Sequence, residues 1–393
     1  MDLKLKPEQE SFRGEIRSFL DQKLTEGLRA GARATPTVFA EPDIAREWQS
    51  ILYERGWLAY NWPREYGGTG WSPVQRYIFE KECALADAPG LPVLGLKLLG
   101  PVLYTFGTSE QKAYYLPRIL SSEHYWCQGF SETGAGSDLA SLRTRAERSN
   151  AGYLVNGGKI WTTHAHFATH MFCLVRTDSS VKAQRGISFV LLDMQDPGVT
   201  VRPIRGLAGD HEVNEVFLKN VAVPRENLVG EEGQGWSIAK FLLENERGGS
   251  CFAPKLLADI ARLHASPAFN ANSTVARKLA KVELEALALE VTELRILAQI
   301  EHGAQPGPQT SMIKLVSSTL RQQIDALAVQ VLGYAGLQLT GARPLYGERC
   351  PEAELTKDSQ IAMPRYLNSQ AWTIFGGSNE IQRSIIAKTV LQL

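Results

Sequence analysis

The chain has 393 residues, of which 44% are hydrophobic and 21% charged, so it is globular in composition and too long for one ordinary hydrophobic core. Lysine plus arginine equals aspartate plus glutamate at 42 each, which gives no support for a nucleic-acid surface. No run approaches the roughly 18 apolar residues of a membrane span. We expect no secretory signal, and the five scattered cysteines without a CxxC motif favour a reduced, cytoplasmic protein.

Residues 1–120 have the apolar spacing of amphipathic helices and are expected to form an N-terminal helical domain. Two helix starts carry capping patterns. Ser72 precedes Pro73, and Thr108 has Gln111 three residues later.

Residues 121–228 consist of short β-rich runs broken by Gly, Asp, Pro or Asn. We expect a compact antiparallel barrel or sandwich in this middle domain. In "GYLVNGGKIWTT" the residues Asn156, Gly157 and Gly158 separate two strand-like runs, a pattern that predicts a β-hairpin.

Residues 229–393 are helical again and contain two long periodic segments. The first is predicted to begin at Asn272 or Ser273 and to end near His302, and the second to end at Gly333. Two such helices can pair as half of a four-helix bundle. The fold class is therefore α+β, with a helical, a β and a helical domain, and a ligand site is expected in the crevice where the β domain meets the helices.

Two stretches of the middle domain could hold a cofactor. The loop "CQGFSETGAGSDLAS" offers glycines for close backbone approach and the hydroxyls of Ser131 and Ser137, which suit a flavin edge or a pyrophosphate, although an ordinary turn can have the same composition. Trp161 follows the predicted hairpin beside two threonines, where it could lie against a planar ring or simply close the barrel. The loop is not GxGxxG between a strand and a helix, so a nicotinamide site is not supported.

Other polar residues give weaker signals. His164, His166 and His170 are close in sequence, but their spacing suits neither one helix face nor a strand, so a metal site is not favoured. Glu244 and Glu246 lie two residues apart in a helical stretch and face different sides of that helix. Glu246 is the more interesting, because small residues that leave room for a ligand follow it.

Taken together, six motifs occur in the order and spacing seen in acyl-CoA dehydrogenases, so the chain resembles that family over nearly its whole length. The motifs are "WPREYGGTGWS", "FGTSEQKAYYLPRIL", "FSETGAGSDLAS", "GGKIWTT", "NEVFLKNVAVPRENLVGEEGQGW" and "IFGGSNEIQRSIIAK". The resemblance implies bound FAD and desaturation of an acyl-CoA thioester, in which a carboxylate removes the α-proton and the β-hydrogen leaves as hydride to flavin N5. Such enzymes belong to lipid metabolism and β-oxidation.

Motif position also implies residue roles. Trp161 and Thr162 match the pair that packs on the flavin and bonds near its N5, and Arg247 matches an active-site arginine. Ser137 is implied near both FAD and the CoA moiety. The other implied cofactor contacts are Gln128, Phe130, Ser131, Gln330, Gly333, Ser378 and Glu380.

The catalytic base departs from the commonest family pattern. Many members carry a glutamate where this chain has Gly376, whereas some place the base on an earlier helix directly before an arginine. Glu246 before Arg247 matches that second arrangement, so Glu246 is the predicted base and Glu244 the weaker alternative. These departures, with a longer segment around residues 336–366, resemble bacterial members that act on bulky or unusual acyl-CoAs such as steroid or dicarboxylic thioesters.

The resemblance also implies partners. Electrons are expected to pass to an electron-transfer flavoprotein, and the assembly is expected to be a homotetramer or an α2β2 heterotetramer with a sister subunit. Two alternative functions stay open from the sequence. The chain could be the non-catalytic subunit of such a heterotetramer, or an acyl-CoA oxidase or flavin monooxygenase of the same superfamily.

Overall fold

The computed structural model describes residues 5–247, 251–271, 273–303, 307–339 and 357–393, without the side chains of 245–247, 357 and 358. The chain divides into two compact units. Unit 1 comprises residues 1–51, 70–91 and 247–393, and unit 2 comprises residues 52–69 and 92–246. The three domain boundaries drawn from the sequence stay a prediction.

Unit 1 is helical. Its helices include α1 (Pro7–Lys23), α2 (Glu26–Ala34), most of α3 (Pro42–Arg55), α4 (Pro73–Leu85), α8 (Ala253–Ala265), α9 (Thr274–Glu301), α10 (Gln309–Leu332), α11 (Lys357–Ser369) and α12 (Asn379–Thr389). The predicted cap is confirmed at α4, where Ser72 and Gln75 form a capping box ahead of Pro73. Helix α9 begins after its N-cap Ser273 and α10 ends at Gly333, as the sequence predicts.

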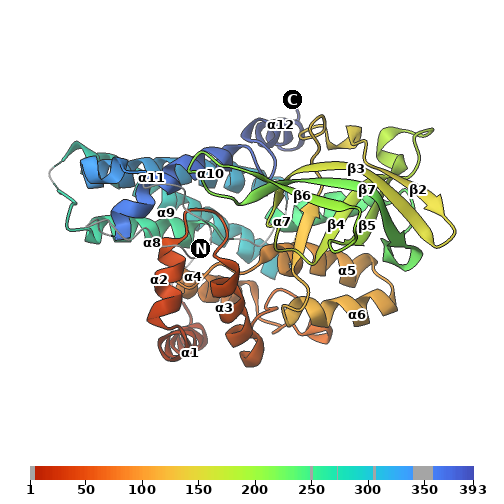
Figure 1. The fold of residues 1–393 in the computed structure, drawn as a ribbon. Coiled ribbons are helices and arrows are strands. Elements are labelled where there is room, and N and C mark those ends of the chain that lie inside the picture. Colours follow the sequence, from red (N-terminus) through yellow and green to blue (C-terminus); the bar gives the residue numbers. More distant parts are fainter. Residues whose placement is uncertain (1–4, 248–250, 272, 304–306, 340–356) are drawn as a thin grey trace. The chain divides into compact units, whose positions relative to one another are not determined.

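Helices α8, α9 and α10 share one apolar core, which includes Leu256, Ile260, Leu279, Ile313 and Ile324. Figure 1 shows α9 and α10 lying side by side, and their residues are in contact. Burial of these aliphatic side chains, at about 1.5–3 kcal/mol each, is the main favourable term in the folding of this bundle. A complete four-helix bundle remains a prediction.

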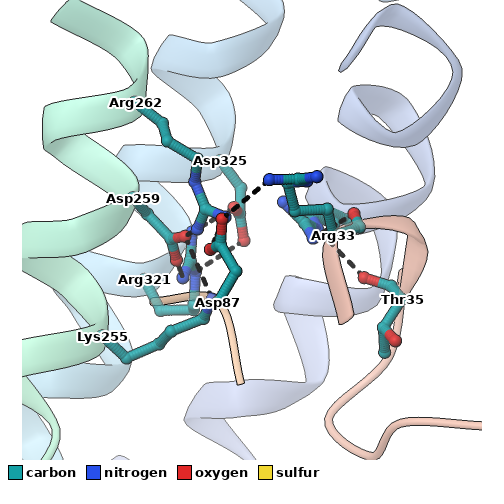
Figure 2. A network of polar contacts seen from close by, with 9 residues as sticks. Arg33, Thr35, Asp87, Lys255, Asp259, Arg262, Arg321 and Asp325 are labelled. Carbon is teal, nitrogen blue, oxygen red and sulfur yellow. Dashed lines mark hydrogen bonds and ion pairs between the residues drawn. The ribbon is translucent and has the colours of Figure 1, made fainter. Parts of the chain in front are cut away.

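A network of ion pairs is buried among the helices of unit 1. Figure 2 shows Arg321 of α10 between Asp259 of α8 and Asp325, with ion pairs to both carboxylates. Arg262 of α8 continues the network to Asp259 and to Asp87, which follows α4. Because buried charges persist only when they are paired, these contacts tie α4, α8 and α10 into a single arrangement.

Unit 2 contains the sheet, a short π-helical segment (Leu94–Leu99) and the α-helices α5 (Gly100–Phe106), α6 (Ser109–Leu120) and most of α7 (Gly235–Arg247). The capping box of Thr108 and Gln111 at the start of α6 is confirmed. The sheet strands are β1 (Trp126–Gly129), β2 (Arg145–Ser149), β3 (Gly152–Thr163), β4 (His170–Arg176), β5 (Ile187–Asp193), β6 (Val199–Ile204), β7 (Val213–Pro224) and β8 (Leu228–Val229).

The sheet follows the order β6-β7-β3-β2-β4-β5-β8, with β1 paired to β4. Most pairings are antiparallel, but β1 with β4 and β2 with β4 are parallel, which the sequence reasoning did not foresee. Its core contains Cys127, Val155, Met171, Val190 and Val216, all fully buried. These side chains belong to five different strands, so burial of this core holds the whole sheet in one register.

The predicted hairpin at Asn156 to Gly158 is wrong, because β3 runs through these residues as one strand that pairs with β7. The register with β7 shifts between Val155 and Gly157, so the glycines mark a β-bulge. Gly157 has φ +153°, and a Cβ there would lie 2.6 Å from Thr144 Oγ1. The backbone conformation and the close approach of Thr144 both require glycine at this position. Glycine is also typical of turns, which is why the sequence pattern resembles a hairpin.

The helical, β and helical order along the chain confirms the predicted fold class. Within the described residues, no helix is long and apolar enough to cross a bilayer.

Candidate functional site

The end of β3 has the most unusual local structure in unit 2. Trp161 has φ +60° and His164 φ +56°, conformations that non-glycine residues seldom adopt. The indole of Trp161 is 60% exposed, which is unusual for so large an apolar ring. Such strain and exposure occur together where a ligand is bound, so the Trp161–His164 turn is the first candidate for a binding surface.

Thr162 lies next to this exposed ring and is buried, with only 1% of its surface accessible. Among the described residues its hydroxyl oxygen has no hydrogen-bond partner. Leaving a buried hydroxyl without a partner costs about 1–3 kcal/mol. This hydroxyl is therefore available to a bound group, as the sequence prediction for Thr162 requires.

The loop between β1 and β2 lies beside the same turn. The Ile160 N–H donates to the Ser131 carbonyl at 2.9 Å, and Lys159 Nζ donates to the Phe130 carbonyl at 3.3 Å. The structure thus brings Phe130 and Ser131 next to the strand segment that leads into Trp161. The ring of Phe130 packs against other aromatic rings in the core, so a cofactor contact of Phe130 would have to come from its backbone.

A buried ion pair anchors this loop. Glu132 accepts from Lys159 Nζ at 2.8 Å and from the backbone N–H groups of Arg143 at 2.6 Å and Thr144 at 2.9 Å. Burial tends to raise the pKa of Glu132, but the Lys159 ammonium and these hydrogen bonds outweigh it and hold the pKa below its usual value. The Glu132 carboxylate is therefore charged at neutral pH, and its bonds to Lys159, Arg143 and Thr144 close the loop at its two ends.

Gly134 and Gly136, in the glycine-rich segment of the loop that Glu132 closes, have free space beside them. A Cβ at Gly134 or Gly136 would meet no atom within 4 Å, and Ser137 is exposed. Gln128 lies on β1 and is half-buried. The predicted contacts of Ser137 and Gln128 with a cofactor stay predictions.

The predicted base is on helix α7. Glu244 is exposed there, while the side chains of Glu246 and Arg247 lie outside the described residues. The chain after α7 is anchored by acidic residues that sequence reasoning missed. The Cys251 N–H donates to Glu80 at 3.3 Å, and Glu293 accepts from the Phe252 N–H at 2.8 Å. These bonds connect the start of α8 to α4 and α9.

The cofactor residues predicted in unit 1 lie at helix ends. Gly333, with φ +59°, ends α10, and Gln330 in its last turn accepts from Lys278 Nζ at 3.3 Å. Ser378 is the N-cap of α12, where its hydroxyl accepts from the Ile381 N–H at 3.4 Å. Glu380 is exposed in the first turn of that helix, where its own backbone N–H and the Ser378 hydroxyl lower its pKa. Their roles toward a cofactor stay predictions.

The three histidines do not form a metal site. No group of three or more His, Cys, Asp or Glu residues suited to a metal occurs in the described ranges. His164 Nδ1 instead bonds the Tyr125 hydroxyl at 2.7 Å, and His170 lies on β4 with its ring against that of His124. His164 therefore belongs to the packing around the turn, and His170 to an aromatic cluster with His124.

Sequence reasoning missed two residues of this site, Lys159 and Asn214. Lys159 is fully buried in the middle of β3, and the only signal was its position two residues before Trp161. Asn214 is 0% exposed and faces Thr162 across the β3–β7 pair. A polar residue at the start of a β-rich run gives no sequence signal of that contact.

The site residues fit a flavin. An exposed indole offers a face for a planar ring, a buried hydroxyl lacks a partner, and an open glycine-rich loop lies beside both. A flavin would provide the partner that the Thr162 hydroxyl lacks.

This combination of fold and site is that of a flavin-dependent dehydrogenase. The chain belongs to the acyl-CoA dehydrogenase family, because the N-terminal, middle and C-terminal domains of acyl-CoA dehydrogenases match residues 6–123, 127–221 and 233–391. The family is one of oxidoreductases, and membership implies a flavin cofactor.

Individual relatives agree with this assignment. The chain is 35% identical to the acyl-CoA dehydrogenase IpdE1 of Mycobacterium tuberculosis, over 98% of this chain and 97% of that protein. It is 28% identical to the cyclohexane-1-carbonyl-CoA dehydrogenase of Geobacter metallireducens, over 94% of this chain and 97% of the relative.

Two solved structures are also similar. A structure described as the Tcur3481-Tcur3483 steroid ACAD superposes with a TM-score of 0.84 at 28% identity, covering 100% of this chain and 99% of the other. The ChsE4-ChsE5 complex from Mycobacterium tuberculosis gives a TM-score of 0.81 at 29% identity, with the same coverage.

Proposed function

We propose that this protein is an FAD-dependent dehydrogenase that introduces an α,β double bond into a bulky acyl-CoA thioester, with Glu246 as the base. The observation that carries the proposal is the Trp161–Thr162 turn, where an exposed indole adjoins a buried hydroxyl without a partner. Family membership supports the reaction class.

The residues of unit 2 would hold the isoalloxazine end of the cofactor. Trp161 supplies an apolar face, the Thr162 hydroxyl a hydrogen bond, and the loop from Gln128 to Ser137 further polar contacts. When bound, the flavin accepts the hydride that leaves the β-carbon. Gln330, Gly333, Ser378 and Glu380 are proposed to contact the rest of the FAD, and Ser137 and Arg247 the substrate.

Assignment of the base to Glu246 is supported by the backbone at Gly376. Gly376 has φ +65° and Gly377 φ +84°, so a side chain at either position would be strained. This segment therefore favours glycine where many relatives carry the glutamate base. Glu246 in the last turn of α7 provides the alternative carboxylate, next to Arg247.

The proposed chemistry needs only a few groups of the chain. The Glu246 carboxylate takes the α-proton, which ends on its oxygen, while hydrogen bonds to the thioester carbonyl stabilise the developing negative charge. A pocket that excludes water raises the basicity of the carboxylate.

A bulky acyl group is proposed on the basis of the relatives. One is described as a steroid ACAD and another as a cyclohexane-1-carbonyl-CoA dehydrogenase, names that indicate ring-containing acyl groups. Because two similar structures are described as pairs of unlike chains, assembly with a sister subunit as an α2β2 heterotetramer is favoured over a homotetramer. An electron-transfer flavoprotein is the proposed electron acceptor.

The test is a Glu246→Gln variant, assayed by the loss of flavin absorbance on anaerobic addition of acyl-CoA. A panel of linear, branched, dicarboxylic and steroid thioesters identifies the substrate first. The variant should keep its flavin and reduce it about 10²–10⁴-fold more slowly, the usual contribution of a general base. Glu244→Gln is the matched control on the same helix and should reduce flavin at the normal rate. Undiminished reduction by Glu246→Gln would refute the assignment.

Purification tests the other parts of the proposal. A yellow protein with about one FAD per chain, stable alone, would favour a catalytic subunit. A colourless chain that takes up flavin only with a sister chain would indicate the non-catalytic partner. Rapid substrate-dependent peroxide formation without another acceptor would indicate an oxidase.

A further inference from the structure

The side chain of Asn214 is fully committed to the turn at the end of β3. Its Nδ2 lies 3.0 Å from the Thr162 carbonyl and 3.0 Å from His166 Nδ1, and its Oδ1 lies 2.6 Å from His211 Nε2. An asparagine amide has two N–H donors and one carbonyl, so it can make all three bonds at once.

The chemistry of the partners fixes the direction of every bond. The Thr162 carbonyl can only accept, so the amide nitrogen must face it. The same nitrogen donates to His166 Nδ1, so that ring must be neutral with its proton on Nε2. His211 must then donate its Nε2 proton to the amide oxygen. Only one set of tautomers satisfies the group.

The histidine rings support this arrangement. His166 and His211 are stacked with ring centroids 3.9 Å apart and planes 19° apart. Burial, together with His211 and His164, lowers the pKa of His166 to about 3, which keeps the ring neutral as an acceptor.

The turn that these groups hold is strained. Trp161 and His164 both have left-handed backbones, and the β3–β7 register shifts between Lys159 and Thr162. Such a backbone persists only when its surroundings hold it. The Glu212 carbonyl accepts the His164 N–H at 2.9 Å, and Asn214 holds Thr162 two residues earlier. The start of β7 thus fixes both ends of the Thr162–His164 segment.

We propose that Asn214, oriented by His166 and His211, is a positioning residue that holds the Trp161–Thr162 turn in the shape that binds the flavin. We call these three side chains the Asn214 clamp. The clamp touches neither flavin nor substrate through its own side chains; it acts through the Thr162 backbone. This inference rests on the proposed function, because it assumes that Trp161 and Thr162 contact a flavin.

The decisive variant is Asn214→Leu, which has similar volume and makes none of the three hydrogen bonds. Apoprotein should bind FAD about tenfold more weakly, the equivalent of one lost hydrogen bond, as measured by quenching of flavin fluorescence. The flavin absorption bands and the reduction potential of the bound flavin should also shift, because the hydroxyl of Thr162 is displaced. A merely structural role would leave spectrum and potential unchanged.

The matched control is Asn156→Leu. Asn156 also bridges β3 and β7, since its Oδ1 accepts from the Asn220 N–H at 2.8 Å, but it lies six residues before Thr162. This variant should keep the FAD affinity, spectrum and potential of the unaltered protein. A milder variant, His211→Phe, keeps a ring beside His166 and removes only the bond to Asn214. It should show the same changes to a smaller extent, and it covers the case in which Asn214→Leu does not fold.

A readout without flavin separates the two proposals. The fluorescence emission of Trp161 is obtained as the difference between each variant and the same variant carrying Trp161→Phe. This emission should shift in the apo forms of Asn214→Leu and His211→Phe, but not in apo Asn156→Leu. If the unaltered protein does not bind FAD although this shift occurs, the proposed function fails and the clamp of the turn stands. If FAD binds and both clamp variants match the unaltered protein in affinity, spectrum and Trp161 emission, the clamp is refuted.

Discussion

Replacement of Lys159 by methionine should strongly destabilise unit 2. Lys159 has no exposed side-chain surface, and its ammonium group lies 2.8 Å from Glu132 Oε1, 2.8 Å from the Leu174 carbonyl and 3.3 Å from the Phe130 carbonyl. Methionine fills similar space but leaves the Glu132 carboxylate without its counter-charge and two carbonyls without this donor.

The magnitude follows from these contacts. Removal of one partner from a buried ion pair costs about 3–5 kcal/mol. A buried carbonyl that loses its donor costs about 1–3 kcal/mol, although this overlaps with the first value because all three bonds come from one ammonium. We expect a loss of about 4 kcal/mol, which for a unit of this size lowers the melting temperature by roughly 10 °C.

Urea unfolding of the apoprotein, followed by tryptophan fluorescence, measures this loss. Lys219→Met is the control, because Lys219 is exposed on the neighbouring strand β7, and it should change stability by less than about 0.5 kcal/mol. The double variant Lys159→Met with Glu132→Gln should be more stable than Lys159→Met alone, because it no longer buries an unpaired charge. If the free energy of unfolding of Lys159→Met were within about 1 kcal/mol of that of the unaltered chain, the reasoning would be refuted, because a buried ion pair that loses one partner predicts a larger loss.

Three further changes test other parts of the structure. Arg321→Met should destabilise unit 1 by about 3–5 kcal/mol in denaturant titrations, because it removes the ion-pair partner of the buried Asp325 and one of the partners of Asp259, which keeps Arg262. Met at the exposed Arg295 should have little effect. Gly157→Ala should lower the urea midpoint, because its Cβ would lie 2.6–2.8 Å from Thr144. Gly158→Ala should be tolerated, because a Cβ there has contacts of 3.7 Å or more. Equal midpoints for the two variants would contradict the bulge. Burial, with a smaller contribution from His211, lowers the pKa of His164 in the folded protein to about 4, whereas the unfolded residue has a pKa of about 6.5. Between these values the unfolded chain binds a proton that the folded chain does not, so stability should fall as the pH drops below about 6.5. That loss is about 2 kcal/mol at pH 5, and urea midpoints across pH 5–7.5 should vary less in a His164→Gln variant.

Local signals could be predicted from the sequence with good accuracy. The caps at Ser72 and Thr108 depend on partners three residues away, so the pattern and the structure describe the same interaction. The limits of α9 and the end of α10 at Gly333 are also local, since a serine N-cap and a left-handed glycine mark them.

Long-range contacts could not be predicted in this way. Lys159 and Glu132 are 27 residues apart, and Asn214 meets Thr162 only because β7 pairs with β3 in one particular register. The cofactor assignments for Trp161 and Thr162 came from motif resemblance. The features that support these assignments, left-handed backbones at Trp161 and His164 and a buried Thr162 hydroxyl, depend on the fold and have no local sequence signal.

The error at Asn156–Gly158 has a consequence for the site. A hairpin there would have placed Lys159 and Thr162 on a separate short strand with an adjustable register. Because β3 is continuous, Gly157 packs against Thr144, the strand pairs with β7 on both sides of the shift between Lys159 and Thr162, and Lys159 is bonded to Glu132. The strained Trp161–His164 segment begins within the last residues of β3, after Lys159, and Asn214 of β7 bonds the Thr162 carbonyl there. Binding and catalytic groups need to be held to within about 0.5 Å of their productive positions, and a strand with a supporting layer does this better than a loop. Gly157, a residue type typical of turns, therefore helps to fix the strand that carries Thr162.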